Sequence, residues 1–258
     1  MFFFKNYITT VPSGRGMRGK FIVIEGTDGT GKETQFRKAL AALQAEGREV
    51  LAMDFPQYGQ PSAYFVERYL NGAYGSSAEV APRVASLFYA LDRFDKAAEM
   101  RAWLEAGKLI LSNRYTTSSL GHQAGKAATE REREAIVSYI EELEYHELGI
   151  PRPDLVILLK MHPFVAQQLV AAKGERSYLN GKSRDIHESD LTHLSKASAS
   201  YLWMAQRDSA WTTVDCMRPG VPEDRLLDPG VPATEKVRTI DDIHVDVLAA
   251  ITALLRGS

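Results

Sequence analysis

Cysteine is almost absent from this chain. Its 258 residues include one cysteine, Cys216, so a disulfide bond within the chain is excluded. Proteins of oxidising compartments commonly rely on disulfide bonds, whereas proteins of reducing compartments keep their thiols free. The cysteine content therefore favours a cytoplasmic location.

The chain also lacks long apolar runs and a strong charge of either sign. No segment approaches the ~20 consecutive apolar residues that a membrane-spanning helix needs. The aromatic start, Phe2 to Phe4, is interrupted by Lys5 and Asn6. The net charge is −2 and the sequence pI is about 6.3, so no basic surface for nucleic acid is indicated. We expect neither a membrane nor a nucleic acid as a partner.

The overall composition is that of an ordinary α/β protein. Hydrophobic residues make up 45% of the chain and charged residues 25%, which suits one domain with a large core. Residues 1–19 contain Gly, Arg and Ser near their end, and we expect them to form a loose extension. We expect residues 20–258 to form the domain.

The segment from Phe21 to Lys32 carries the strongest signal. Its apolar start, Phe21 to Ile24, predicts a buried strand, three glycines interrupt it, and an apolar helical face with Phe36, Leu40 and Leu43 follows. A strand, a Gly-rich turn and a helix in this order are the context of a phosphate-binding loop. The alternative is a Gly-rich turn that only joins a strand to a helix, but the spacing favours phosphate binding.

The residue types of this loop suit polyphosphate chemistry. Glycines let backbone N–H groups turn inward around phosphate oxygens, and the helix N-terminus adds partial positive charge. Lys32 would bring a full positive charge to the β and γ oxygens. The motif usually continues with Ser or Thr, whose hydroxyl binds Mg²⁺, but Glu33 stands here and Thr34 follows. The metal ligand is therefore left open.

The rest of the chain alternates between predicted strands and helices. Further strands are predicted at 50–53, 108–112, 155–159 and 211–215, a charged helix at 129–148, and a closing helix around Ile243, Val247 and Ile251. The unbroken apolar run at 155–159 is typical of a strand covered on both faces, which indicates a parallel sheet. We therefore expect a three-layer, doubly wound α/β fold with ligands at the carboxyl ends of the strands. Residues 217–234, with four prolines, are predicted to be a loop.

A long helix is predicted to end at Ala106. Apolar residues recur along it at helical spacing, which predicts the face that packs inward: Val80, Val84, Leu87, Leu91 and Phe94. Its predicted polar face carries Asp92, Arg93, Asp95, Lys96 and Arg101.

The segment at about 173–189 is polar and basic and contains two glycines. It can be read as an ordinary surface loop. The other reading is a mobile lid over the phosphate site, because it carries Arg176, Lys182 and Arg184.

Five motifs, in order, resemble those of the thymidylate kinases over roughly residues 18 to 215. They are Glu25-Gly-Thr-Asp-Gly-Thr-Gly-Lys32, Phe55-Pro-Gln-Tyr-Gly59, Leu87-Phe-Tyr-Ala-Leu-Asp-Arg93, Asn113-Arg-Tyr115 and Arg184-Asp-Ile-His-Glu188. The resemblance implies a P-loop nucleoside monophosphate kinase fold. It also implies transfer of the γ-phosphoryl group of ATP to thymidine monophosphate, with Mg²⁺, by a homodimer.

On the ATP side, the resemblance implies that the loop and the lid hold the phosphates. The implied residues are Gly26, Thr27, Asp28, Gly29, Thr30, Gly31, Lys32, Glu33, Thr34, Arg176, Lys182 and Arg184. Family members that lack an arginine within the loop have basic residues in the lid, and this chain is similar to that bacterial type. Lys32, Arg114, Arg184 and Asp28 would be catalytic.

On the acceptor side, the implied residues are Phe55, Pro56, Tyr58, Tyr89, Arg93, Arg114, Ser118, Ser119, His122 and Gln123. Tyr89 would stack on thymine, although it can also be read as a core residue, and Arg93 would meet the pyrimidine edge. Arg114 would hold the acceptor phosphate, because a planar guanidinium suits phosphate oxygens. Asp28 would meet the 3′-hydroxyl of the sugar.

Four positions depart from the family pattern. Glu33 replaces the hydroxyl residue, Asn113 replaces the Asp of the usual Asp-Arg-Tyr, Gln57 replaces a frequent Arg, and His122 stands where Tyr is common. Glu33 and Asp28 are the candidate metal ligands, with Glu188 as a third carboxylate that could share the ion, while Glu33 can also be read as a solvated residue of the first helical turn. The departures leave two alternatives open, namely a kinase for another nucleoside monophosphate and a nucleotide-binding protein without turnover.

Overall fold

The computed structural model describes residues 18–172 and 191–257. Its core is a five-stranded sheet with the strand order β2-β3-β1-β4-β5, and all neighbouring strands are parallel. The strands are β1 (Phe21–Glu25), β2 (Val50–Asp54), β3 (Leu109–Asn113), β4 (Leu155–Lys160) and β5 (Trp211–Asp215). The predicted parallel sheet is confirmed.

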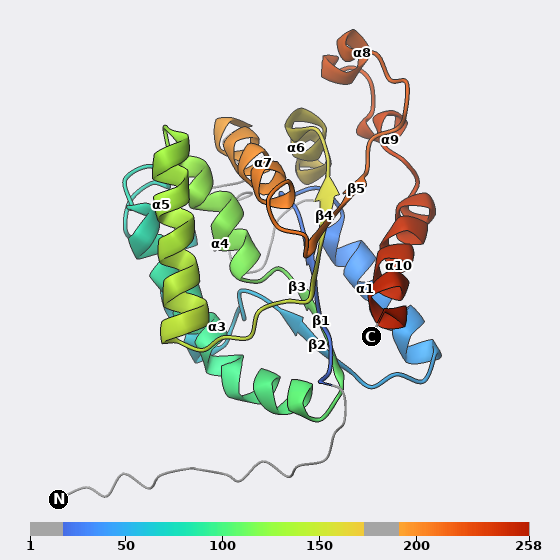
Figure 1. Cartoon of the computed structure of the whole chain (residues 1–258). Coiled ribbons are helices and arrows are strands. Elements are labelled where there is room, and N and C mark those ends of the chain that lie inside the picture. Colours follow the sequence, from blue (N-terminus) through green and yellow to red (C-terminus); the bar gives the residue numbers. More distant parts are fainter. Residues whose placement is uncertain (1–17, 173–190, 258) are drawn as a thin grey trace, which may run out of the picture.

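Helices cover both faces of the sheet, as Figure 1 shows. The helices are α1 (Lys32–Ala45), α2 (Tyr64–Leu70), α3 (Pro82–Glu105), α4 (Thr116–His122), α5 (Glu130–Glu141), α6 (Pro163–Ala171), α7 (Leu191–Ala205), α8 (Glu223–Leu227), α9 (Ala233–Lys236) and α10 (Ile240–Arg256). Helices α1 and α10 lie on one face, and α3, α4, α5 and α7 lie on the other. Two short 3₁₀ segments, η1 (Pro61–Ala63) and η2 (Ala124–Lys126), and a π-helical segment, η3 (Glu142–Glu147), complete the description.

The central position of β1 in the sheet explains why the first four residues of this strand are all apolar. Successive side chains of a strand point to opposite faces, and both faces are covered here. Phe21 and Val23 belong to the core beneath α3, α5 and α7, whereas Ile22 and Ile24 belong to the core beneath α1 and α10. All four side chains are fully buried.

The prediction for the inward face of α3 was wrong for four of its five apolar residues. Val80 is buried as predicted, just before the helix begins, but the exposed fractions are 47% for Val84, 38% for Leu87, 41% for Leu91 and 48% for Phe94. The face that packs inward carries small residues together with Met100, Leu104, Asp92 and Arg93. Alanines allow the helix to approach its neighbours closely, and both buried charges have partners. Asp92 accepts hydrogen bonds from Gln57 N (2.9 Å) and Ser62 Oγ (2.7 Å).

The charged helix predicted at 129–148 is divided into α5 and the π-helical segment η3. A π-helical turn contains more residues than an α-helical turn, so residues on the same face are further apart in the sequence. The three- and four-residue spacing of an α-helix therefore does not predict which residues of η3 point inward. Glu144 is the residue of η3 that becomes fully buried.

The region predicted as a loop at 217–234 contains α8 and the start of α9. Lys236 connects this region to α6. Its buried ammonium group donates hydrogen bonds to Asp228 O (2.7 Å) and to Oε1 of Gln168 in α6 (3.0 Å). The closing helix is confirmed as α10, with Ile243, Val247 and Ile251 buried. In residues 18–172 and 191–257, no helix is long and apolar enough to cross a membrane.

Candidate functional site

The loop between β1 and α1 has the backbone that its glycines predict. Gly26, Gly29 and Gly31 have φ values of 148°, 86° and 84°, which L side chains rarely adopt. Gly29 is constrained twice, because a Cβ atom there would lie 2.1 Å from Ala166 O. The loop therefore opens at the carboxyl edge of the sheet, next to the N-terminus of α1.

Lys32 is the first residue of α1 and turns back over this loop. Its Nζ donates to Thr27 O (2.7 Å) and lies 3.7 Å from Asp28 Oδ1. Thr30 Oγ1 donates to the same carbonyl at 2.9 Å. The ammonium group is thus held beside the loop on which phosphates are expected to lie.

Arg114 follows β3 and enters the same site from the neighbouring strand. Its φ of 66° makes it the one non-glycine residue with a positive φ in the described part of the chain. Such a conformation costs about 1–3 kcal/mol and commonly marks a functional position. Arg114 Nη2 donates to Asp28 Oδ1, and Nη1 lies 3.8 Å from Glu25 Oε1. Burial opposes the charged guanidinium, but attraction to Asp28 and Glu25 outweighs it and raises the pKa of Arg114 well above its ordinary value.

Glu25, at the end of β1, accepts several hydrogen bonds at the carboxyl edge of the sheet. Its buried carboxylate accepts from Gly26 N (2.9 Å), Thr117 Oγ1 (2.7 Å), Ser118 Oγ (2.8 Å) and Tyr201 OH (3.0 Å). Burial, followed by the nearby Glu25, raises the pKa of Tyr201 well above its ordinary value, so its hydroxyl remains a donor. Glu25 thus joins the loop to α4 and α7. Glu25 belongs to one of the predicted motifs, but this role was not predicted from the sequence, and neither was the part that Tyr201 plays.

Arg93 and Glu144 form a second, fully buried pair. Arg93 Nε and Nη2 donate to Glu144 Oε2 and Oε1, both at 2.6 Å. Nη2 also donates to Ser119 Oγ (2.9 Å) and Nη1 donates to Tyr115 O (3.3 Å). Burial disfavours the charged form, but the charge and hydrogen bonds of Glu144 outweigh it and raise the pKa of Arg93. Glu144 was not predicted as a site residue, because nothing in its local sequence pattern distinguishes it from the exposed acidic residues around it.

Several predicted acceptor residues gather near these two pairs. Ser118 and Ser119 bond to Glu25 and Arg93 respectively. His122 is buried, and its Nδ1 lies 3.1 Å from Nε2 of the stacked His193. Gln123 is buried, and its Oε1 has no hydrogen-bond partner among the described residues.

The aromatic residues predicted to line the acceptor site differ in burial. Phe55 is buried against Tyr115, with ring centroids 5.7 Å apart, whereas Tyr58 is exposed. Tyr89 is half-buried and meets Tyr69 edge to face at 6.2 Å. Both interpretations of Tyr89 therefore stay open, since one side of its ring packs on the protein.

The side chain of Glu33 is not in the arrangement that a metal ligand would need. It is exposed and pairs with Arg37, one helical turn further on, at 2.5 Å. This geometry favours the interpretation of Glu33 as a solvated residue of the first helical turn. Within the two described ranges, no group of three or more His, Cys, Asp or Glu side chains could hold a metal ion.

Asp54, which the sequence analysis missed, lies at the end of β2 on the same edge. Its Oδ1 accepts a hydrogen bond from Asn113 Nδ2 at 3.0 Å. Desolvation by the surrounding groups raises the pKa of Asp54 to about 6, although the hydrogen bond from Asn113 opposes this. Because the side chain is still exposed, solvent limits the effect.

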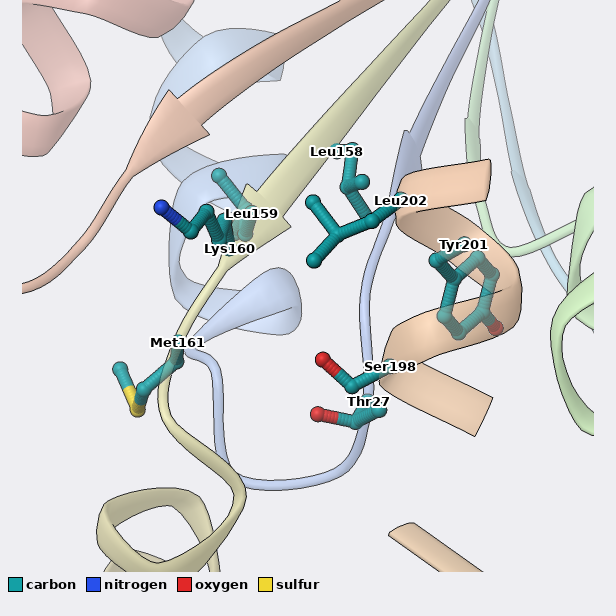
Figure 2. A pocket seen from close by; sticks show the side chains of 8 residues that line it. All are labelled: Thr27, Leu158, Leu159, Lys160, Met161, Ser198, Tyr201 and Leu202. Carbon is teal, nitrogen blue, oxygen red and sulfur yellow. The ribbon is translucent and has the colours of Figure 1, made fainter. Parts of the chain in front are cut away.

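A small cavity of about 10 Å³ lies between the loop, β4 and α7. Figure 2 shows the hydroxyl groups of Thr27 and Ser198 pointing the same way at its edge, with Met161 and Lys160 across from them. A cavity of this size holds one water at most. This cavity is therefore too small for a nucleotide. The predicted lid residues Arg176, Lys182 and Arg184, and also Glu188, lie outside the described residues.

Comparisons with known proteins agree with this geometry. The family described as thymidylate kinase matches residues 24–221. A thymidylate kinase from Mycobacterium tuberculosis is 29% identical over 216 residues, which cover 82% of this chain and 99% of that protein. One from Leifsonia xyli is 30% identical over 213 residues, covering 81% and 92% of the two chains. A solved thymidylate kinase structure from Candida albicans shares the fold, with a TM-score of 0.63, 18% identity and 92% coverage of both chains.

Proposed function

The chain belongs to the thymidylate kinase family, and we propose on this basis that it transfers the γ-phosphoryl group of ATP to thymidine monophosphate. As a member of that family it is an ATP-dependent nucleoside monophosphate kinase. The observation that supports the assignment of the site is the convergence of Lys32 and Arg114 on Asp28 at the phosphate-binding loop. Two cations, one from the first residue of α1 and one directly after β3, share one carboxylate there.

The loop and Lys32 would bind the donor phosphates. The transition state of phosphoryl transfer spreads negative charge over the transferred group, so fixed positive charge and alignment matter more than a strong base. Lys32 supplies such a charge, already held by Thr27 O. The remaining loop residues would donate backbone N–H groups, and the basic lid residues at 173–189 would complete the field.

Arg114 would bind the acceptor phosphate with its planar guanidinium. An arriving phosphate would compete with Asp28 for Arg114 Nη2 and Lys32 Nζ. Asp28 would then be released to accept a hydrogen bond from the 3′-hydroxyl of the sugar. Ion pairing inside the site thus keeps both cations in position before the substrate binds.

The base pocket would lie between α3 and α4. Ser119 accepts from Arg93, so its own hydroxyl hydrogen remains to be donated to a base. Arg93 would act on the pyrimidine edge largely through this serine, because Glu144 occupies its Nε and part of its Nη2. Tyr89 would stack on the base, with Phe55, Pro56, Tyr58, Ser118, His122 and Gln123 around it.

Mg²⁺ would be part of the reaction, as family membership implies. When bound, it offsets the negative charge of phosphate oxygens. Oxygen atoms are the ligands it prefers, and the chain offers such atoms beside the loop.

We also propose that the exposed stripe of α3 (Val84, Leu87, Leu91 and Phe94) forms a homodimer interface. Contiguous apolar surface of this kind commonly marks an interaction site. Phe65 of α2 extends it, because this exposed ring stacks on Phe88 of α3 with centroids 5.8 Å apart. Leu91→Glu should convert a dimer to a monomer in light scattering. The matched control Val245→Glu, at an exposed apolar position of α10, should stay dimeric.

The remaining proposals follow the family. Residues 20–258 would form one kinase domain after a loose extension, with a lid at about 173–189, and the protein would act in the cytoplasm.

An ADP-release assay against a panel of nucleoside monophosphates tests the function directly. Thymidine monophosphate should give the highest kcat/KM, and only when Mg²⁺ is present. Preference for another monophosphate would favour a different acceptor specificity. Nucleotide binding without ADP release would identify a protein that has lost turnover.

A further inference from the structure

Asp54 and Asn113 form a pair at the edge where the phosphate-binding loop begins. They are register partners at the ends of β2 and β3, and Asn113 is in turn the partner of Ile24 in β1. Asn113 Nδ2 donates to Asp54 Oδ1 at 3.0 Å, which orients the carboxylate and the amide together.

The other end of the same amide lacks a partner. Asn113 is 7% exposed, and its Oδ1 makes no hydrogen bond to any residue that the structure describes. Leaving a buried oxygen unpaired costs about 1–3 kcal/mol, so a hydrogen-bond donor or a cation is expected to face it. A cation or an N–H donor of a ligand would satisfy it.

Among the carboxylates at this edge that the structure describes, Asp54 is the one that is neither paired with a cation nor hydrogen-bonded on both oxygens. Asp28 is bound by Arg114, Glu33 pairs with Arg37, and Glu25 is hydrogen-bonded on both oxygens. Asp54 makes no ion pair among the described residues and is exposed. Lys32, Arg114 and Glu33 nonetheless lie close enough to act on its charge, which places it beside the loop.

We propose that Asp54 and Asn113 together hold the Mg²⁺ ion that accompanies the nucleotide. This inference rests on the proposed kinase function. The carboxylate of Asp54 lies on the strand next to Asn113 and accepts a hydrogen bond from its amide.

The donor set suits this ion. Mg²⁺ prefers hard oxygen ligands and is usually bound by one or two carboxylates, waters and substrate phosphates, without an all-protein cage. One carboxylate and one amide oxygen meet that description. Asn113 would serve twice, since its Nδ2 orients Asp54 and its Oδ1 faces the ion.

Binding measurements test the proposal without relying on activity. Calorimetric titration of ADP, in EDTA and then in Mg²⁺, gives the gain in affinity due to the metal. Mn²⁺ paramagnetic resonance with ADP reports the ion itself. Asp54→Asn should weaken metal binding by about 10- to 100-fold and leave ADP affinity in EDTA unchanged.

A charge exchange makes the test specific. Asp54→Asn combined with Asn113→Asp reverses the pair, with the amide on β2 and the carboxylate on β3, and should restore Mn²⁺ binding. The matched control is Asp215→Asn, because Asp215 is an exposed carboxylate at the end of β5, the other edge strand. This control should bind Mn²⁺ and ADP like the unchanged protein.

Two results would overturn the proposal. One is an Asp54→Asn protein that binds Mn²⁺ and ADP as well as the unchanged protein. The other is a double variant as weak as Asp54→Asn alone, which would show that charge is not shared between the strands. Failure of the unchanged protein to bind ADP even in EDTA would instead contradict the proposed kinase function.

Discussion

Two arginine–carboxylate pairs lie at the same edge of the sheet, and they differ in how completely they are enclosed. In the buried pair, the side chains of Arg93 and Glu144 are 2% and 0% exposed. In the loop pair, those of Arg114 and Asp28 are 17% and 9% exposed. The buried pair also has neutral partners on both sides, whereas the loop pair has a second cation, Lys32, on the same carboxylate.

The difference separates a structural role from a binding role. Thr116 Oγ1 donates to Glu144 at 2.6 Å, so the buried pair connects α3, α4 and η3. Such a pair gains little from a ligand, because its charges and donors are largely satisfied already. The loop pair instead combines two cations, a backbone held at positive φ and an opening to solvent, so a phosphate can replace the carboxylate as their partner.

Removal of the buried carboxylate should have the largest effect. Glu144→Gln leaves the Arg93 guanidinium buried without a counter-charge, which costs about 3–5 kcal/mol of folding free energy. Chemical denaturation measures this loss. The control is Glu147→Gln, an exposed neighbour in η3, which should change stability very little. A loss of less than about 1 kcal/mol in Glu144→Gln would contradict the structural role.

Removal of the loop cation should damage turnover and spare the fold. Lys32→Ala should lose about 3–4 kcal/mol of transition-state stabilisation, a few hundredfold in kcat, because one fixed positive charge is gone. Steady-state kinetics and thermal denaturation of the same preparation measure both quantities. Activity within a few-fold of the unchanged enzyme would remove the loop from the reaction.

Tyr89 lies on α3, one helical turn before Arg93, and tests whether this helix contributes to the acceptor site. Tyr89→Ala should weaken binding of the acceptor by about 1–3 kcal/mol if the ring stacks on a base. ATP affinity should change little, and Tyr89→Phe should keep most of the binding. Calorimetry with each nucleotide separates this from a core role, in which stability and both affinities would fall together.

The sequence predicted the parts of this molecule that are local in the chain. The loop, the strand β1 and the helix α1 are contiguous, and their glycines and apolar runs determine their conformation directly. Glu144, Tyr201 and Asp54 were missed because their roles depend on partners far away in the sequence. Arg93 and Glu144, for example, are separated by 51 positions.

The error on α3 has a different cause. An apolar stripe predicts that a helical face is covered, but it does not say by what. The buried face of α3 is recognisable only once Glu144 and Gln57 are in place, since they provide partners for Arg93 and Asp92. The uncovered stripe is the surface that we assign to a second copy of the chain.

Substitution of Glu33 should have the smallest effect on stability, and it provides the reference value for an exposed ion pair. Glu33 is a carboxylate with an arginine partner, like Asp28 and Glu144, but its side chain is 55% exposed and that of Arg37 is 75% exposed. Solvent screens such a pair, and one helical turn of separation gives about 0.3–0.5 kcal/mol. Glu33→Gln should therefore lose no more than this in chemical denaturation, and the loss should vanish in high salt. The Mg²⁺ concentration for half-maximal activity should stay within about twofold, since 0.4 kcal/mol corresponds to a factor of about two. A much larger shift would return Glu33 to the metal site and weaken the assignment of that role to Asp54.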